Sequence, residues 1–184
     1  MVSSLPASGA PLTRGLSLTQ RVFAGSASRK RLKTVEDGMA LVEDNLAIEL
    51  RVTDALADAT SRYLYDAGGK RVRPMLTILT SQLGDGATAN VVGGATALEL
   101  THLGSLYHDD VMDGADVRRG VPSAHSAWGN NIATLTGDLL FSRASQIMAR
   151  YGEQAMQLQA DTFERLVLGQ MHETVGPTDA DDPV

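Results

Sequence analysis

The chain has 184 residues, the size of a single domain, and 43% of them are apolar, enough to build a core. It contains no cysteine, which excludes a disulfide scaffold, a thiolate zinc site and a cysteine nucleophile. Sixteen basic and 22 acidic side chains give a net charge of −6, which argues against nucleic acid as the main partner.

The charge is unevenly distributed along the chain. Residues 1–35 hold six basic residues and no acid, whereas the other ten basic residues and all 22 acids lie in 36–184. The apolar runs of 1–35 are too short for a signal-peptide core or a membrane span. This basic, Ser-rich segment fits either an organellar transit peptide or a poorly ordered arm. We expect the arm, and with it a cytoplasmic protein without a membrane span.

Apolar residues recur at three- and four-residue steps along most of the remaining chain, which predicts an all-α protein. The first stretch fits one amphipathic helix or two in series, and Asn90 is the expected cap of the third. Gly68–Gly69, Gly84–Gly86, the loop at 114–122 and Gly176–Pro177 separate or end the helices. The expected helical stretches are 34–66, 74–83, 91–113, 131–151 and 153–171.

Three aspartates, Asp109, Asp110 and Asp113, stand at the C-terminal end of the predicted third helix. In a helix Asp109 and Asp113 share one face, and Asp110 lies about 100° from Asp109. The three charges repel one another, and the helix dipole at this end also favours a cation. Hard carboxylate oxygens suit Mg²⁺, which completes its shell with water and substrate phosphates. The alternative is a solvated acidic helix end.

Two basic segments flank the aspartates in the sequence. Arg118 and Arg119 follow Asp113 closely, and paired guanidinium groups could grip a diphosphate from the side opposite a metal. The segment GGKRVRP at 68–74 combines a double glycine with three cations at a helix start, which favours anions. Taken separately, the arginines could instead pair with Asp113 and Asp116, and the glycine segment could be a basic turn.

His102 lies seven residues before Asp109, so both side chains fall on one stripe of the predicted helix. A histidine at this place could donate a hydrogen bond to a phosphate oxygen in the same pocket. The alternative is a structural histidine. The order of these elements decides between the readings, because a cationic turn, a histidine, an aspartate cluster and an arginine pair surround a metal site with two phosphate grips.

This combination resembles the trans-isoprenyl diphosphate synthases, or polyprenyl synthetases. The resemblance is carried by GGKRVRP at 68–74, LTHLGSLYHDDVMDGADVRRGVPSAH at 100–125 and TGDLLF at 136–141, and it spans about 36–176. It implies a helical bundle of the isoprenoid synthase type and a Mg²⁺-dependent prenyltransferase. Such an enzyme joins isopentenyl diphosphate to an allylic prenyl diphosphate by ionisation, condensation and proton loss, and its relatives are generally homodimers.

The resemblance also implies roles for individual residues. Asp109 and Asp113 match the carboxylates that bind Mg²⁺ on the allylic diphosphate, with Asp110 supporting them, and Arg118 matches the arginine that grips this diphosphate. Gln170 matches a polar residue of the same cavity. The positions that match the grip on isopentenyl diphosphate are Lys70, Arg73, His102 and Arg119.

Product length in this family depends on the depth of the apolar channel beside the aspartates. Bulky residues one turn before the first aspartate close the channel in relatives that make short products. Here Gly104 and Ser105 occupy those positions. Both are small, which predicts an open channel and a long product.

One departure from the family pattern concerns the second aspartate-rich motif, which relatives carry far downstream and which 177–184 do not match. We therefore expect three segments: a basic arm at 1–35, the N-terminal part of a synthase bundle at 36–176, and an acidic tail or truncation point at 177–184. The bundle would be incomplete at its C-terminus. Three explanations stay open: a fragment of a homodimeric synthase, a subunit of a heteromeric synthase, or a non-catalytic prenyl diphosphate-binding or regulatory protein.

Two protein classes outside this family share some of these motifs. A class I terpene cyclase also carries aspartates in the pattern D-D-x-x-D, but it has no use for a second diphosphate grip such as GGKRVRP. A purely structural helical module has no reason to combine the acidic arc with both basic segments. Metal binding that strengthens with diphosphate would separate a synthase-type site from either an acidic helix face or a structural module.

Overall fold

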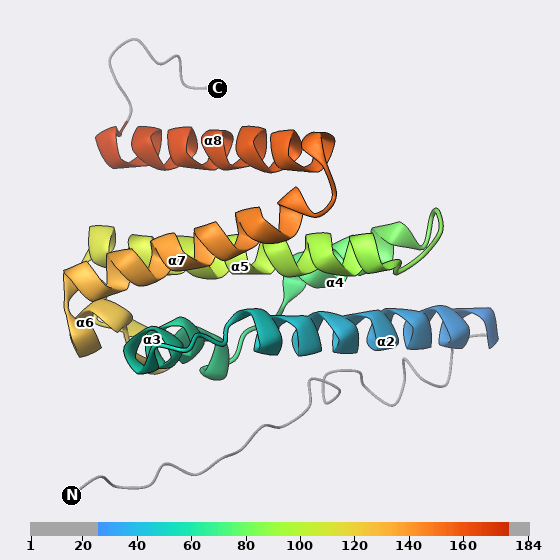
Figure 1. Ribbon diagram of the computed structural model, residues 1–184, viewed down its shortest axis with the longest axis horizontal. Coiled ribbons are helices and arrows are strands. Elements are labelled where there is room, and N and C mark those ends of the chain that lie inside the picture. The colour runs from blue at the N-terminus through green and yellow to red at the C-terminus, as the bar shows by residue number, and fades with distance from the viewer. Residues whose placement is uncertain (1–25, 177–184) are drawn as a thin grey trace, which may run out of the picture.

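The computed structural model describes residues 26–176 and confirms an all-α fold (Figure 1). The helices lie in layers, with α2 and α3 on one side, α4, α5 and α7 in the middle and α8 on the other side. A two-stranded ladder and the short helix α6 connect α5 to α7. The bounds are α2 Ser26–Glu49, α3 Ala55–Asp66, α4 Val72–Ser81, α5 Ala89–Asp113, β1 Val117–Arg118, β2 Val121–Pro122, α6 Ala124–Trp128, α7 Asn130–Ala149 and α8 Glu153–Val175.

The first predicted stretch forms two helices in series, α2 and α3. Asp54 separates them, and its side chain accepts a 2.9 Å hydrogen bond from the Ala57 amide, which caps α3. Helix α2 begins at Ser26 and so runs through ten residues that we expected in the arm. Residues 26–33 hold no Gly or Pro and are rich in Ala, Leu, Arg and Lys, which favour a helix. Residues 1–25 and the expected tail at 177–184 lie outside the described residues, and the three-segment division stays a prediction.

Helix α5 begins at Ala89, two residues earlier than the sequence indicated. Its cap is Thr88, whose hydroxyl accepts from the Val91 amide at 3.4 Å, so the prediction that Asn90 caps this helix was wrong. Thr and Asn are both good capping residues, and the sequence offered both within three positions. The helix ends at Gly114, which adopts the left-handed conformation (φ 61°).

The loop at 114–122 contains a small β-hairpin that the sequence did not predict. Strands β1 and β2 pair Val117 with Pro122 and Arg118 with Val121. The turn residues Arg119 (φ 54°) and Gly120 (φ 80°) both have positive φ, as a two-residue hairpin turn requires. Two residues per strand are too few for an alternating pattern to show in the sequence.

The core surrounds α5, which packs against α2, α4, α6 and α7. Twelve residues of α5 are buried, and they cover most of the helix apart from the side that lines the cavity described below. Tyr107 is the largest of the fully buried side chains; its hydroxyl donates to the Thr60 carbonyl and accepts from the Leu64 amide at 3.3 Å. Tyr107 thereby joins α5 to α3. Among the described residues, the helices are all too short or too polar to cross a membrane.

Candidate functional site

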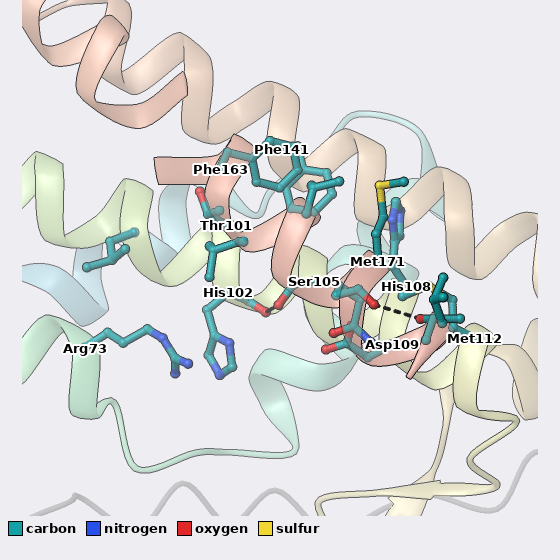
Figure 2. Close-up of a pocket in the computed structure, with 16 residues that line it drawn as sticks. Arg73, Thr101, His102, Ser105, His108, Asp109, Met112, Phe141, Phe163 and Met171 are labelled. Carbon is teal, nitrogen blue, oxygen red and sulfur yellow. Dashed lines mark hydrogen bonds between the residues drawn. The ribbon is translucent and has the colours of Figure 1, made fainter. Parts of the chain in front are cut away.

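A cavity of about 670 Å³ lies along α5, with α7 and α8 as its other walls and one residue of α4 at its edge. Figure 2 shows its polar residues along α5, and the aromatic rings of Phe141 and Phe163 against it. The α5 residues of the wall recur every three or four positions, so they form one stripe of the helix. They are Leu98, Thr101, His102, Ser105, His108, Asp109 and Met112.

One end of the cavity is cationic. Arg73 from the first turn of α4 and His102 from α5 both line it (Figure 2). Burial first, and then the charges of Arg73, Arg119 and other nearby arginines, lower the pKa of His102 to about 4. His102 is therefore neutral at pH 7 and can donate one hydrogen bond to an anion.

The turn that precedes α4 is held by Arg71, to which the sequence analysis gave no role. Arg71 is 5% exposed, and its guanidinium bonds Glu43 of α2 at 2.8 Å and Glu99 of α5 at 3.3 Å. It also donates to the Tyr65 and Gly68 carbonyls, at 3.5 Å each. Glu99 is 2% exposed, and burial raises its pKa while Arg71 opposes the rise. Arg71 thus joins α2, α5 and the end of α3 at the base of the turn.

Arg119 grips the same turn from the hairpin. Its guanidinium donates to the Leu64 carbonyl at 2.7 Å and to the Gly68 carbonyl. Burial lowers its pKa, and the neighbouring Arg71 adds to this effect. Within residues 26–176, Arg71 and Arg119 are the two non-glycine residues with positive φ, and both donate to Gly68. Neither lines the cavity, and Lys70 is exposed outside it.

The two outer aspartates differ from the middle one. Asp109 lines the cavity, and its pKa is raised by burial first and then by the charge of Asp113, which is exposed. A cation between them would remove this repulsion, and their hard oxygens fit Mg²⁺. In the described part of the chain, no three His, Cys, Asp or Glu side chains gather closely enough to hold a metal. Water and ligand oxygens would have to complete the shell of an ion held here.

Asp110 is fully buried and faces away from the cavity wall. Its Oδ1 accepts from Arg118 Nε at 2.7 Å and Nη2 at 2.6 Å, and among the described residues Oδ2 has no hydrogen-bond partner. This pair ties the hairpin to the end of α5. The sequence alternative that Arg118 and Arg119 pair with Asp113 and Asp116 does not describe the structure. Arg118 bonds Asp110, and Arg119 bonds backbone carbonyls.

The two residues expected to set product length lie in different places. Ser105 lines the cavity, whereas Gly104 is buried where α5 crosses α7. A Cβ on Gly104 would lie 2.9 Å from the Phe141 ring and 3.0 Å from the Gly137 carbonyl oxygen. Gly104 therefore permits the close approach of two helices.

Gln170 lines the cavity from α8, as predicted. The aromatic residues of the opposite wall were missed: the rings of Phe141 and Phe163 lie 4.6 Å apart, and His108 stands edge-on to Phe141 at 5.2 Å. His108 Nε2 lies 3.1 Å from the Thr134 carbonyl and 3.3 Å from Asp138. Phe141 is the last residue of TGDLLF, so the sequence gave a reason to consider the wall formed by α7. The apolar stripe of α8 is weak in the sequence, and it gave no such reason for Phe163.

The fold and the site together define a class: an all-α bundle whose central helix places a carboxylate and a cationic pocket along one cavity with apolar walls. Comparisons with known proteins agree with this class. The profile of the family described as polyprenyl synthetase matches residues 54–183. The chain is 44% identical over 178 residues to the nonaprenyl diphosphate synthase of Mycobacterium tuberculosis, covering 95% of this chain and 50% of that protein.

Two further relatives add to this. Component 2 of the heptaprenyl diphosphate synthase of Geobacillus stearothermophilus is 35% identical, with 82% of this chain and 47% of that protein covered. The structure of geranylgeranyl pyrophosphate synthase from Corynebacterium glutamicum, complexed with calcium and isoprenyl diphosphate, matches with a TM-score of 0.72 and 42% identity. That match covers 86% of this chain and 48% of the other. The chain belongs to the polyprenyl synthetase family, and it spans about half the length of the curated relatives it matches.

Proposed function

We propose that this chain forms the first half of a trans-prenyl diphosphate synthase site, which joins isopentenyl diphosphate to an allylic prenyl diphosphate. One observation carries the proposal: the cavity has a carboxylate at one end, a cationic pocket at the other and apolar walls between them. Two diphosphates joined to apolar chains match this distribution of charge. Relatives are named as prenyl diphosphate synthases, and one solved structure holds calcium and isoprenyl diphosphate.

The residues at the two ends of the cavity are proposed to bind different substrates. Asp109 and Asp113 would hold Mg²⁺ on the allylic diphosphate, and the bound ion would help this diphosphate to leave as an anion. Arg118 is 30% exposed beside them and is oriented by Asp110. Arg73 and His102 would bind isopentenyl diphosphate, with Lys70 at the surface of the same turn. Arg119 would support this grip by holding the turn.

The apolar walls protect the reacting carbons from water. Leu98, Phe141, Phe163, Leu166 and Val167 line the cavity. Breaking of the allylic C–O bond leaves a carbocation, and the double bond of isopentenyl diphosphate then forms a new bond to that carbon. A proton is lost to the departing diphosphate, which is a stronger base than the nearby side chains once it carries the released charge. Excluded water keeps the carbocation from hydrolysis.

Product length is proposed to depend on Ser105 and on the aromatic pair across the cavity. Ser105 leaves space beside Asp109, whereas Phe141 and Phe163 narrow the cavity from α7 and α8. Ser105→Phe should shorten the product, and Phe163→Ala should lengthen it. An unchanged product distribution in both variants would contradict this assignment. Gly104→Phe is unsuitable for the test, because it would force α5 and α7 apart.

A homodimer is the expected assembly. The second candidate is a subunit of a heteromeric synthase, which the two relatives named component 2 favour. In that case a partner would supply the second aspartate-rich motif. A third reading is a non-catalytic subunit that binds prenyl diphosphate. Action in the cytoplasm stays a prediction.

The test measures binding and turnover on the same protein. Mn²⁺ binding is titrated with and without inorganic diphosphate, and product is sought from radiolabelled isopentenyl diphosphate, farnesyl diphosphate and Mg²⁺. We expect diphosphate to strengthen Mn²⁺ binding, and Asp109→Ala to abolish the increase. Asp44→Ala, on the exposed side of α2, is the matched control. An affinity for Mn²⁺ that is the same with and without diphosphate would contradict the proposal. Binding without product would favour the subunit reading.

A further inference from the structure

The ion pair between Arg71 and Glu99 is the most deeply buried one in the described residues. The two side chains are 4% and 2% exposed, and neither faces the cavity. Taking two charges out of water costs free energy that their attraction only partly returns. An apolar pair of similar volume would fill the same space with equal or greater stability. Stability alone therefore gives no reason for charges at these two positions.

The Arg71–Glu99 ion pair lies beside the two residues proposed to bind isopentenyl diphosphate, Arg73 and His102. Arg71 stands between Lys70 and Arg73 in the chain, and its positive φ turns the backbone from the double glycine into α4. Glu99 precedes His102 by three residues of α5, so the two side chains are neighbours on the helix surface, with Glu99 on the buried side. The ion pair thus fixes the start of α4 against α5 at the level where Arg73 and His102 line the cavity.

The directional contacts of Arg71 fix more than one distance. Its five donors form a planar fork, and they bond Glu43, Glu99 and the carbonyls of Tyr65 and Gly68. Its charged carbon also lies 4.8 Å from the centre of the Tyr65 ring. These contacts set the orientation of the turn as well as its position, which an apolar side chain does not do.

We infer that Arg71 and Glu99 act as positioning residues for the cationic diphosphate pocket, by holding Arg73 toward an anion beside His102. This inference rests on the proposed function. It concerns the end of the cavity that would take isopentenyl diphosphate. The opposite end, at Asp109, is held by the separate pair of Asp110 and Arg118.

The decisive variant replaces both charges, as Arg71→Met with Glu99→Leu. The double change removes one cation and one anion, so the net charge of −6 is unchanged. It leaves no unpaired charge in the core at Glu99, while Glu43, whose side chain is 27% exposed, stays hydrated. Arg71→Met alone is expected to lower the urea midpoint of unfolding, and the double variant is expected to recover it.

Two ligands separate positioning from general damage. Isopentenyl diphosphate reports on the Arg73 end, and farnesyl diphosphate with Mg²⁺ reports on the Asp109 end, both by equilibrium titration. We expect the double variant to bind isopentenyl diphosphate about tenfold or more weakly, as for a lost supporting contact, and to bind farnesyl diphosphate normally. Arg150→Met, which breaks an exposed ion pair with Glu49 far from the cavity, should change neither affinity.

Unchanged binding of isopentenyl diphosphate in the double variant would overturn the inference. So would an equal loss of both ligands, because that result describes damage to the whole fold. If the unmodified chain binds neither ligand, the proposed function fails and the inference falls with it. If the unmodified chain binds both and the double variant does too, the inference alone fails.

Discussion

Helices α5 and α8 have nearly the same length, 25 and 23 residues, and run along the same cavity, yet they are held in different ways. Twelve residues of α5 are buried, whereas none of the side chains of α8, all within the described range, is buried. Helix α5 packs against α2, α4, α6 and α7, whereas α8 packs mainly against α7 (Figure 1).

The difference separates two tasks within one cavity. The residues proposed to bind diphosphate, such as His102 and Asp109, project from the helix that the core fixes most firmly. The residues proposed to line the apolar chain, such as Phe163 and Leu166, project from the helix with least support. Binding of charged groups needs fixed geometry, whereas contact with a hydrocarbon chain tolerates movement.

The largest effect should come from equal truncations on the two helices. Leu100 on α5 is fully buried, and Leu168 on α8 is 47% exposed. Leu100→Ala should lower the free energy of unfolding by about 3 kcal/mol, because it leaves a cavity in the core. Leu168→Ala should change it by about 0.5 kcal/mol or less. Urea denaturation measures both, and similar losses would contradict the contrast between the helices.

The next test compares two adjacent aspartates of α5. Asp110→Asn should destabilise the fold by about 2 kcal/mol, because it weakens a buried charged hydrogen bond with Arg118. Asp109→Asn should cause no loss of stability at neutral pH. Burial raises the pKa of Asp109, so the folded chain holds this proton more tightly and loses stability as pH rises past the usual Asp range. A larger loss of stability for Asp109→Asn than for Asp110→Asn would contradict the structural role given to Asp110.

Two glycines, one on each helix, test the same difference in packing by adding a methyl group instead of removing side-chain atoms. Gly104→Ala on α5 should destabilise by about 1 to 2 kcal/mol, since its Cβ meets the Gly137 carbonyl and the Phe141 ring. Gly169→Ala on α8 should stabilise by about 0.5 to 1 kcal/mol, because nothing lies within 4 Å of the added carbon and alanine favours a helix. Thermal unfolding of both variants measures the two signs, and equal signs would contradict the packing described here.

The last test, which involves no change in stability at neutral pH, is a titration. The His102 imidazole should titrate near pH 4 in the free chain, followed by its proton resonances in NMR. The unfolded chain therefore binds this proton first as pH falls below about 6.5, so His102 lowers stability between about pH 6.5 and 4. Inorganic diphosphate with Mg²⁺ should raise the pKa of His102. A free-chain pKa near 6.5 would contradict the cationic pocket.

Much of this architecture could be predicted from the sequence. The apolar spacing predicted the long helices, because a buried face repeats at the helical period. The stripe of His102 and Asp109 was also predictable, since seven residues make two turns. The hairpin and α6 were not predictable, because their few residues are placed by contacts far away in the chain. The Tyr63 hydroxyl bonds the Pro122 carbonyl at 2.9 Å across 59 positions.

The candidate site was likewise predictable only in part. The sequence indicated the residue types that bind a diphosphate but treated the cations of GGKRVRP as equivalent. The structure separates them: Arg73 faces the cavity, Arg71 lies in the core, and Lys70 is exposed. The acidic partners of Arg71 are Glu43 and Glu99, each 28 positions away on another helix. A charge that pairs across such a separation has no local pattern, so the buried role of Arg71 could not be read from its own segment.

The weak support of α8 has a consequence for motion. Hydrogen bonds of a helix with few buried contacts open by local unfolding, whereas those of a surrounded helix open only when the whole domain unfolds. Amide protons of α8 should therefore exchange with solvent well before those of α5. Each local opening would also expose one side of the cavity, so the long hydrocarbon chain that we propose as its ligand would be able to enter or leave sideways, without threading through the cavity from one end.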